Sequence, residues 1–208
     1  PQKYLSNLLL LFCLFFSACN RNSVTKEPEK ILHLSAGGRI TTLDPALASD
    51  LVSSYITASF YDTLIQYDYT ARPYKLIPSM LEKMPEISED QMIYRFKLRD
   101  DLFFQEKPEI KGDEERLSRK ISSKDVVFSF LRLADARLHS PGYWLIRGKI
   151  KGLNTFYEKT LNAQRNDYSP YESACEGFII IDNLTFEIHL EKTDPRFLYC
   201  LAMPYMSV

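Results

Sequence analysis

The sharpest patterns in the sequence are an alternation of apolar and basic residues in one segment and a helical repeat in another. Over Met92–Arg99 the alternation sets in after Tyr94, which is typical of an antiparallel strand with one buried face. Ser122 and Asp125 have the spacing of a capping box at the start of a helix. Apolar residues follow them at i, i+3, i+4 and i+7, namely Val127, Phe130, Leu131 and Ala134. The second pattern therefore predicts a helix with one buried stripe.

Weaker patterns predict further elements on the N-terminal side. Residues 31–34 and 64–68 are short apolar runs that predict strands. Residues 50–64 predict an amphipathic helix, with Ser49 or Asp50 as its cap. The buried face of this helix is expected to carry Leu51, Ile56, Phe60 and Leu64.

The C-terminal part predicts a hairpin followed by a short helix. Residues 178–181 and 184–190 are strand-like and flank Asp182-Asn183, a pair typical of a type I′ turn. Asp194-Pro195-Arg196 then begins a short apolar helix. Residues 106–120 mix charges of both signs and are expected to form a solvated loop. These elements together predict an α+β fold with a mainly antiparallel sheet.

The first thirty residues differ from the rest in composition. Lys3 precedes an apolar run, residues 8–16, that is too short to span a bilayer and leads through two small residues to Cys19. Residues 1–18 therefore have the pattern of a secretory signal peptide. The end of this segment also resembles the bacterial lipobox, which makes Cys19 the predicted lipid anchor; a plain signal peptide with a free thiol is the alternative. Residues 19–30 are polar and predict a tether.

Charge and composition narrow the classes of function. The 208 residues carry 26 Lys and Arg against 27 Asp and Glu, a formal net charge of −1. Because there is no overall basic surplus to neutralise phosphates, general nucleic-acid binding is set aside. Beyond the signal segment and the predicted lipid anchor Cys19, the cysteines that remain are Cys175 and Cys200. They would either pair in an oxidising compartment or stay as two separate buried thiols.

The residues show no pattern of catalysis or metal binding. His33, His139 and His189 are far apart, and none has a second ligand at metal-binding spacing. No nucleophile elbow, Walker loop or dinucleotide fingerprint occurs. Asp100-Asp101 and Glu114-Glu115 have neighbouring cations and no apolar surroundings that would raise a pKa, so we expect them to be solvated. The prediction is a protein that is not an enzyme and holds no metal or cofactor.

Several segments, taken in order, resemble one protein family. They are residues 40–45, 60–68, 77–82, 93–99, 125–130 and 194–198, which read ITTLDP, FYDTLIQYD, IPSMLE, IYRFKLR, DVVFSF and DPRFL. Spaced matches in the right order over nearly all of residues 31–208 are more specific than any single motif. The chain resembles the family 5 bacterial extracellular solute-binding proteins, the oligopeptide- and dipeptide-binding receptors of ATP-driven importers. The charged residues 106–120 depart from the family, in which a short turn is usual there.

The resemblance implies the N-terminal part of a two-lobed periplasmic-binding-protein-like fold. Residues 31–61 would begin the main subdomain of the first lobe, and residues 62–208 would form a smaller α+β subdomain inserted in it. Family members are commonly more than twice this length. We therefore expect a truncated gene product that lacks the second lobe and does not bind its ligand tightly alone.

The function implied by the resemblance is that of a substrate-binding lipoprotein of an ABC transporter. Hinge closure would trap a peptide or similar small solute and present it to membrane permease subunits. The protein would act as a monomer outside the cytoplasm, in the periplasm or at the cell surface, anchored to the membrane by lipid. An envelope lipoprotein that uses the same fold for protein–protein interaction is the alternative.

Two segments match the cleft-lining segments of the family. The first is Ser49-Asp50-Leu51, and the second contains Gly142, Tyr143 and Trp144. The aromatic pair would form a flat amphipathic wall against which a ligand lies. Helix capping is the alternative role for Asp50, and core packing is the alternative for the aromatic pair.

Overall fold

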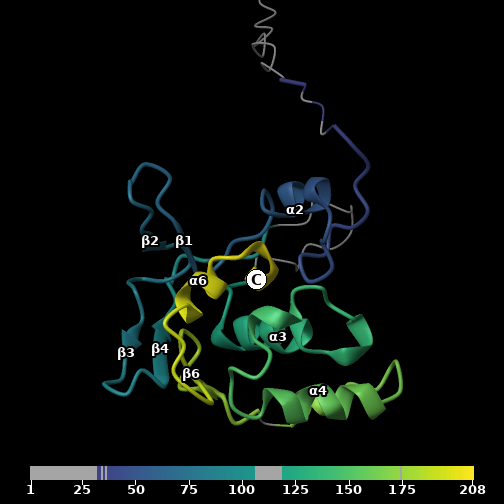
Figure 1. Cartoon of the computed structure of the whole chain (residues 1–208), viewed down its shortest axis with the longest axis vertical. Helices are drawn as coiled ribbons and strands as arrows, with labels where there is room; N and C mark the ends of the chain where they lie inside the picture. Colours follow the sequence, from purple (N-terminus) through teal and green to yellow (C-terminus); the bar gives the residue numbers. More distant parts are fainter. Residues whose placement is uncertain (1–31, 34, 36, 106–118, 174) are drawn as a thin grey trace, which may run out of the picture. The chain divides into compact units, whose positions relative to one another are not determined.

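The protein is described by a computed structural model that places residues 32–33, 35, 37–105, 119–173 and 175–208 (Figure 1). The chain divides into two units, Pro1–Ser35 and Ala36–Val208. The predicted signal segment, Cys19 and the predicted tether lie outside the described residues, as does most of the charged run. None of the helices in the described part is long and apolar enough to cross a membrane.

The described strands form two antiparallel sheets. In the smaller sheet, β1 (Ile65–Tyr67) pairs with β2 (Leu76–Pro78). The larger sheet has the order β3-β4-β6-β5. Its strands are β3 (Glu86–Ile87), β4 (Ile93–Lys97), β5 (Phe178–Ile180) and β6 (Thr185–His189). Every pairing between these strands is antiparallel, which confirms the predicted fold class.

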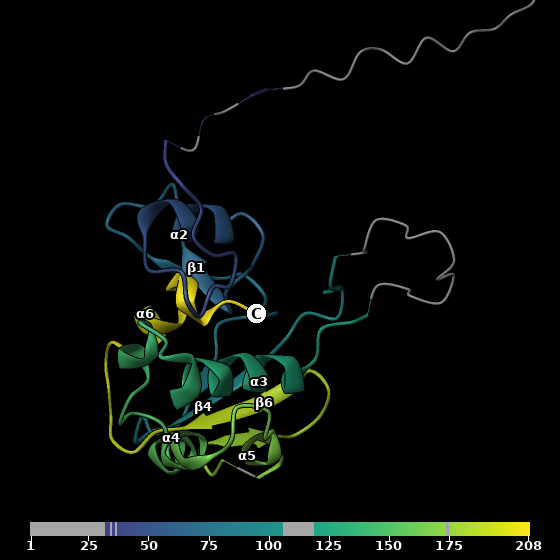
Figure 2. The same ribbon diagram turned by 90° about the vertical axis from the view of Figure 1, so that its right-hand side faces the viewer.

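Helices cover one face of the larger sheet. Figures 1 and 2 show α3 and α4 on the same side of β4 and β6. The helices in chain order are α2 (Leu51–Thr57), α3 (Ser123–Leu133), α4 (Leu153–Asn162), α5 (Ser169–Glu172) and α6 (Phe197–Leu201). Short 3-10 turns cover Ala136–Leu138, Tyr143–Leu145 and Pro204–Met206. The opposite face of the sheet carries Arg95, which forms an ion pair with Glu187 at 2.7 Å.

The two sharpest sequence patterns are both confirmed. Along β4, Tyr94 and Phe96 are buried and Arg95 and Lys97 are exposed. At the start of α3, the Asp125 carboxylate accepts a hydrogen bond from the backbone N–H of Ser122 at 2.8 Å. The predicted stripe of α3 is buried, namely Val127, Phe130, Leu131 and Ala134. In both elements the face that carries the apolar side chains is the face that is buried, so the spacing of apolar residues predicted the buried face correctly.

The predicted helix over residues 50–64 is wrong in length and in its buried face. Helix α2 ends at Thr57, and Leu51 is 85% exposed. The buried side chains are Ser53 and Thr57. The Ser53 hydroxyl accepts a hydrogen bond from the backbone N–H of Thr41 at 2.9 Å, so a polar residue faces inward to satisfy a backbone donor. The spacing of apolar residues therefore predicted the wrong buried face for this helix.

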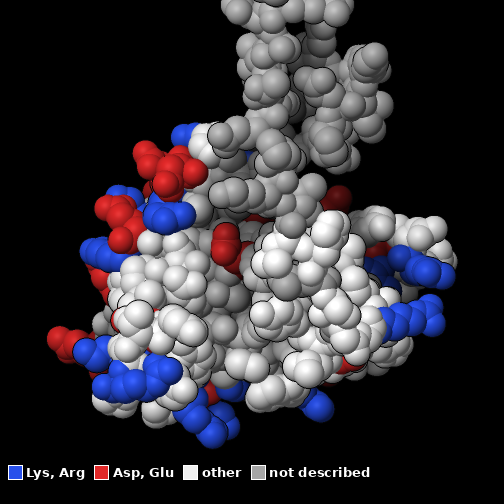
Figure 3. All heavy atoms as spheres, turned by 90° about the horizontal axis from the view of Figure 1, so that it is seen from above, with Lys and Arg blue, Asp and Glu red and all other residues white. Residues whose placement is uncertain are grey.

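The inverted polarity of α2 leaves apolar side chains at the surface. Leu51 and Tyr55 of α2 are exposed by 85% and 76%, and Phe60, which follows the helix, is exposed by 65%. Figure 3 looks down on the molecule from the side on which Figure 1 places α2, and charged side chains there lie mainly towards the margins.

Two other predictions need correction. Of the predicted strand over residues 31–34, only Leu32 and His33 are among the described residues; they lie in no strand, and Leu32 is 78% exposed. The hairpin of β5 and β6 is confirmed, but its turn is not type I′, since neither Asp182 nor Asn183 has a positive φ. Instead the Asp182 carboxylate accepts hydrogen bonds from the backbone N–H groups of Leu184 at 2.7 Å and of Thr185 at 2.8 Å. These bonds stabilise a turn whose residues have negative φ.

The two described cysteines are separate buried thiols. Neither Cys175 nor Cys200 is in a disulfide. The Cys175 thiol donates a hydrogen bond to the carbonyl of Lys151 at 3.4 Å, and burial raises its pKa. Of the two alternatives for these cysteines, the structure shows the unpaired one.

Candidate functional site

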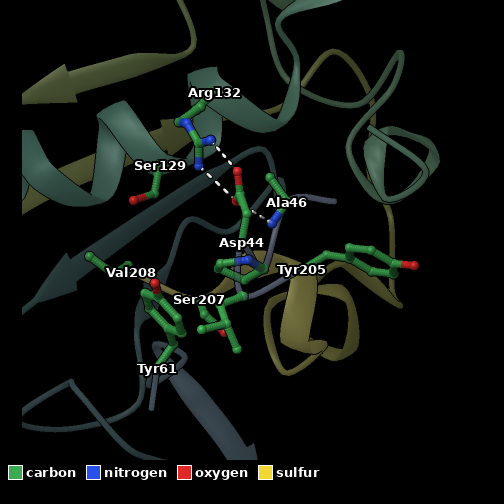
Figure 4. Close-up of a pocket in the computed structure, with 10 residues that line it drawn as sticks. Asp44, Ala46, Tyr61, Ser129, Arg132, Tyr205, Ser207 and Val208 are labelled. Carbon is green, nitrogen blue, oxygen red and sulfur yellow. Dashed lines mark hydrogen bonds and ion pairs between the residues drawn. The ribbon is translucent and has the colours of Figure 1, made fainter. Parts of the chain in front are cut away.

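A hollow of about 400 Å³ lies between the segment that precedes α2, the last turns of α3 and the C-terminal residues (Figure 4). Its polar lining includes Asp44, Ser129 and Arg132, and Tyr61 and Tyr205 add aromatic surface. These residues come from parts of the chain that are far apart in sequence. The hollow therefore exists only because the fold brings the Leu-Asp-Pro turn onto α3.

An ion pair between Asp44 and Arg132 joins the two sides of this hollow. Arg132 Nη1 donates to Asp44 Oδ1 at 2.9 Å, and Nη2 donates to the other carboxylate oxygen. Figure 4 shows the two side chains pointing at each other in this forked arrangement. Bidentate pairing of this kind fixes orientation as well as distance. It ties the turn at Asp44 to a helix 88 residues further along the chain.

The turn at Asp44 is also organised locally. The Asp44 backbone N–H donates to the Thr42 hydroxyl at 3.0 Å, and the Ala46 N–H donates to Asp44 Oδ1 at 3.1 Å. The Ser140 hydroxyl donates to the carbonyl of Ala46, which connects this turn to the segment before Trp144. These hydrogen bonds restrict the position of the Asp44 carboxylate, which therefore faces Arg132 in a defined orientation.

The electrostatics of the hollow follow from this pair. The hydrogen bond from the Arg132 guanidinium holds the pKa of Asp44 below its ordinary value, against the opposing effect of burial. The same bond raises the pKa of Arg132. Because the two charges neutralise each other, the other groups that the hollow offers to a ligand are hydroxyl groups and aromatic rings.

We expect Asp44→Asn to lower the free energy of unfolding by about 1–2 kcal/mol at pH 7, because it removes a partly buried charge-assisted pair. Since the folded-state pKa of Asp44 is lowered, its contribution is present above the ordinary carboxyl pKa near 4 and is lost as the pH falls through the folded value. Urea unfolding at pH 7 and pH 3 measures this. Asp100→Asn, at an exposed site, is the charge-matched control and should change little; an equal loss in both variants would contradict the expectation.

The first predicted ligand segment lies at the start of α2. Asp50 is the N-cap of this helix: its carboxylate accepts from the Ser53 N–H at 2.8 Å and from the Thr41 hydroxyl. These bonds lower its pKa to about 2. Ser49 and Leu51 are exposed, and none of the three predicted residues lines the hollow. Capping accounts for the Asp50 carboxylate, and a role in ligand binding stays a prediction.

The second predicted ligand segment, which contains Gly142, Tyr143 and Trp144, does not line the hollow but packs against Tyr205, which does. Gly142 is buried so closely against Tyr205 that a Cβ atom would lie 2.5 Å from the ring. The Tyr143 ring stacks on Tyr157 with centroids 4.8 Å apart and an interplanar angle of 1°. Trp144, the only tryptophan, is 62% exposed and is therefore not a core residue. Its contact with a ligand stays a prediction.

None of the residues that line the hollow was predicted from the sequence as a ligand residue, and two of its polar residues, Ser129 and Arg132, illustrate why. Both lie on α3, a segment that the sequence marked by its helical period and, over residues 125–130, by its family resemblance, but not as a site. An isolated arginine in the last turn of a helix is common, because it complements the helix dipole. No local signal in the sequence connects it with an aspartate 88 residues earlier.

Comparison with known proteins identifies the family. Residues 75–208, most of the chain, match the family model described as bacterial extracellular solute-binding proteins, family 5 Middle. The chain belongs to this family of solute-binding proteins. The match includes β2, all four strands of the larger sheet and the helices that cover it.

Two curated relatives of this family 5 chain are named as periplasmic proteins. The probable ABC transporter periplasmic-binding protein SapA of Escherichia coli (strain K12) is 34% identical over 173 residues. The peptide transport periplasmic protein SapA of Salmonella typhimurium is 32% identical over 173 residues. Each alignment covers 82% of this chain and 27% of the relative, so the chain spans about a quarter of the length of these proteins.

Solved structures support the fold of the family 5 chain. The substrate-binding domain of an oligopeptide ABC transporter from Bacillus anthracis is 27% identical, with a TM-score of 0.59 over 81% of this chain and 27% of that one. The α+β arrangement is therefore that of the periplasmic-binding-protein fold. The resemblance noted in the sequence is confirmed at the level of family and fold.

Proposed function

We propose that this chain is part of the substrate-binding receptor of an ABC importer and that its ligand is a peptide. The observation that carries the proposal is the alignment, over 82% of the chain, with periplasmic proteins whose names assign them to an ABC transporter and to peptide transport. The hollow beside Asp44 and Arg132 agrees with it, since its groups are suited to holding a solute. Such a receptor would act by closing two lobes around the ligand and releasing it to permease subunits.

The ligand-contacting surface is proposed to be the exposed face near Trp144. Trp144 and Tyr143 are adjacent, and the stacking of Tyr143 on Tyr157 holds that ring in a fixed orientation. An aromatic wall of this kind contacts a peptide without selecting one side chain. Gly142 and residues Ser49–Leu51 complete the proposed set.

The proposed location is outside the cytoplasm. The periplasmic relatives and the signal-peptide pattern of residues 1–18 support it. Lipidation of Cys19, a monomeric state and the division of the fold into residues 31–61 and 62–208 are parts of the same proposal. Loss of radiolabelled palmitate incorporation in Cys19→Ser would support the anchor, and unchanged incorporation would contradict it.

Peptide uptake tests the proposal. In cells that lack other peptide importers, deletion of the gene should abolish uptake of a labelled tripeptide mixture, and the intact gene should restore it. Trp144→Ala in the restored gene should raise the peptide concentration for half-maximal uptake roughly 5- to 30-fold, because an aromatic contact of about 1–2 kcal/mol is lost.

Tyr168→Ala is the matched control, since Tyr168 is 65% exposed, as Trp144 is, and lies outside the proposed ligand segments. Its uptake should equal that of the unchanged gene. Uptake that is unaffected by deletion would show that the peptide assignment is wrong. Equal effects of the two aromatic substitutions would reject the placement of the ligand at Trp144.

A further inference from the structure

A basic groove lies between two loops on another part of the molecule. Its walls are the turn Arg147–Lys149 and the loop Lys192–Arg196, and its volume is about 730 Å³. None of the residues that line it lines the hollow at Asp44. The basic groove is therefore a separate feature.

One ion pair in the basic groove is internal. Lys149 Nζ lies 2.7 Å from the Asp194 carboxylate, and both side chains are largely buried. Three further cations, Arg147, Lys192 and Arg196, are exposed. Among the described residues, these three side chains form no ion pair and no side-chain hydrogen bond. With four basic groups and one carboxylate, the groove has a net charge of +3, although the whole chain has a net charge of −1.

The backbone holds the cations of the basic groove in place. The Glu191 N–H donates to the carbonyl of Lys149 at 2.7 Å, which fastens one wall to the other. The Asp194 carboxylate accepts from the Arg196 N–H at 2.9 Å, and the Asp194 carbonyl accepts from the Phe197 N–H at 2.9 Å. The cationic side chains therefore start from fixed backbone positions, which lowers the entropy cost of gathering them around an anion.

The lining of the basic groove favours a phosphate group over a protein surface. The remaining residues are Gly148, Thr193 and Pro195, so no large apolar side chain is present to act as the anchor that protein interfaces use. Two guanidinium groups match the oxygen geometry of phosphate, and a lysine adds a point charge. Local clustering of cations on a nearly neutral protein concentrates anions at that place.

We propose that the basic groove binds a phosphate group, carried either by an anionic phospholipid headgroup or by a soluble phosphate ester. The probes are vesicles of phosphatidylcholine with or without phosphatidylglycerol, and glycerol phosphate in solution. The full chain is used as Cys19→Ser, so that acylation cannot anchor it. The test variant combines Arg147→Gln, Lys192→Gln and Arg196→Gln. The matched control removes the same three charges at exposed positions elsewhere, with Arg39→Gln, Lys124→Gln and Arg165→Gln.

The groove variant should bind its phosphate probe roughly tenfold more weakly or worse, and the control variant should bind like the parent chain. A selective loss on phosphatidylglycerol vesicles identifies a lipid source, and a selective loss for glycerol phosphate identifies a soluble one; both support the proposal. Equal loss in both variants, or no binding of either probe by the parent chain, would overturn it. Thermal unfolding of both variants verifies that each remains folded.

Discussion

Phe186→Ala is expected to lower the free energy of unfolding by about 3–5 kcal/mol. Phe186 lies on β6 and is fully buried, opposite Phe96 of β4. The two rings stack with centroids 5.1 Å apart and an interplanar angle of 13°. The substitution removes apolar contacts and leaves a cavity between the sheet and the helices above it, and the surrounding structure relaxes only in part. Equilibrium urea unfolding, followed by far-UV circular dichroism, gives the value.

Phe60→Ala is the control for this substitution. Phe60 is 65% exposed, so the same change in chemistry should alter the free energy of unfolding by less than about 0.5 kcal/mol. A loss at Phe60 as large as that at Phe186 would mean that the core is not where the structure places it. Because both variants replace phenylalanine with alanine, a difference between them reports the burial of the side chain and not the type of residue that is replaced.

Gly177→Ala is expected to cost about 3 kcal/mol, through crowding and not through φ. An added Cβ would lie 2.4 Å from Ile150 Cγ2 and 2.6 Å from the carbonyl oxygen of Lys151. The backbone cannot easily move away, because the Gly177 N–H donates to that carbonyl at 2.8 Å and its own carbonyl accepts from the His189 N–H at 2.8 Å. Thermal and urea unfolding measure the loss.

Gly148→Ala separates crowding from backbone conformation. Nothing lies within 4 Å of a Cβ at Gly148, but its φ is +65°, so alanine there meets only the left-handed penalty of about 1 kcal/mol. We expect a clearly smaller effect than at Gly177. If Gly148→Ala were the more damaging variant, the close approach of Gly177 to Lys151 would be in doubt.

The contacts behind these predictions differ in whether they could be predicted from the sequence. The stacked rings of Phe96 and Phe186 occupy inward positions of strands whose alternation is visible in the sequence. The close approach at Gly177 has no such sign, since a glycine before an apolar run is typical of any turn. The family, likewise, was recognisable from ordered segments, whereas the hollow at Asp44 was not.

Local pattern was sufficient for β4 and α3 because each buries apolar side chains on the face that its period marks, and because the capping bond of Asp125 joins neighbours in sequence. The same reasoning failed at α2, where the Ser53 hydroxyl turns inward and accepts hydrogen bonds from the backbone N–H groups of Thr41 and Thr42. The pairing of Asp44 with Arg132 and the gathering of cations in the basic groove arise only when distant segments meet. Hydrophobic period reports where apolar surface is removed from water, but it carries no information about which remote polar groups complete each other's hydrogen bonds and charges, and only the tertiary structure decides that.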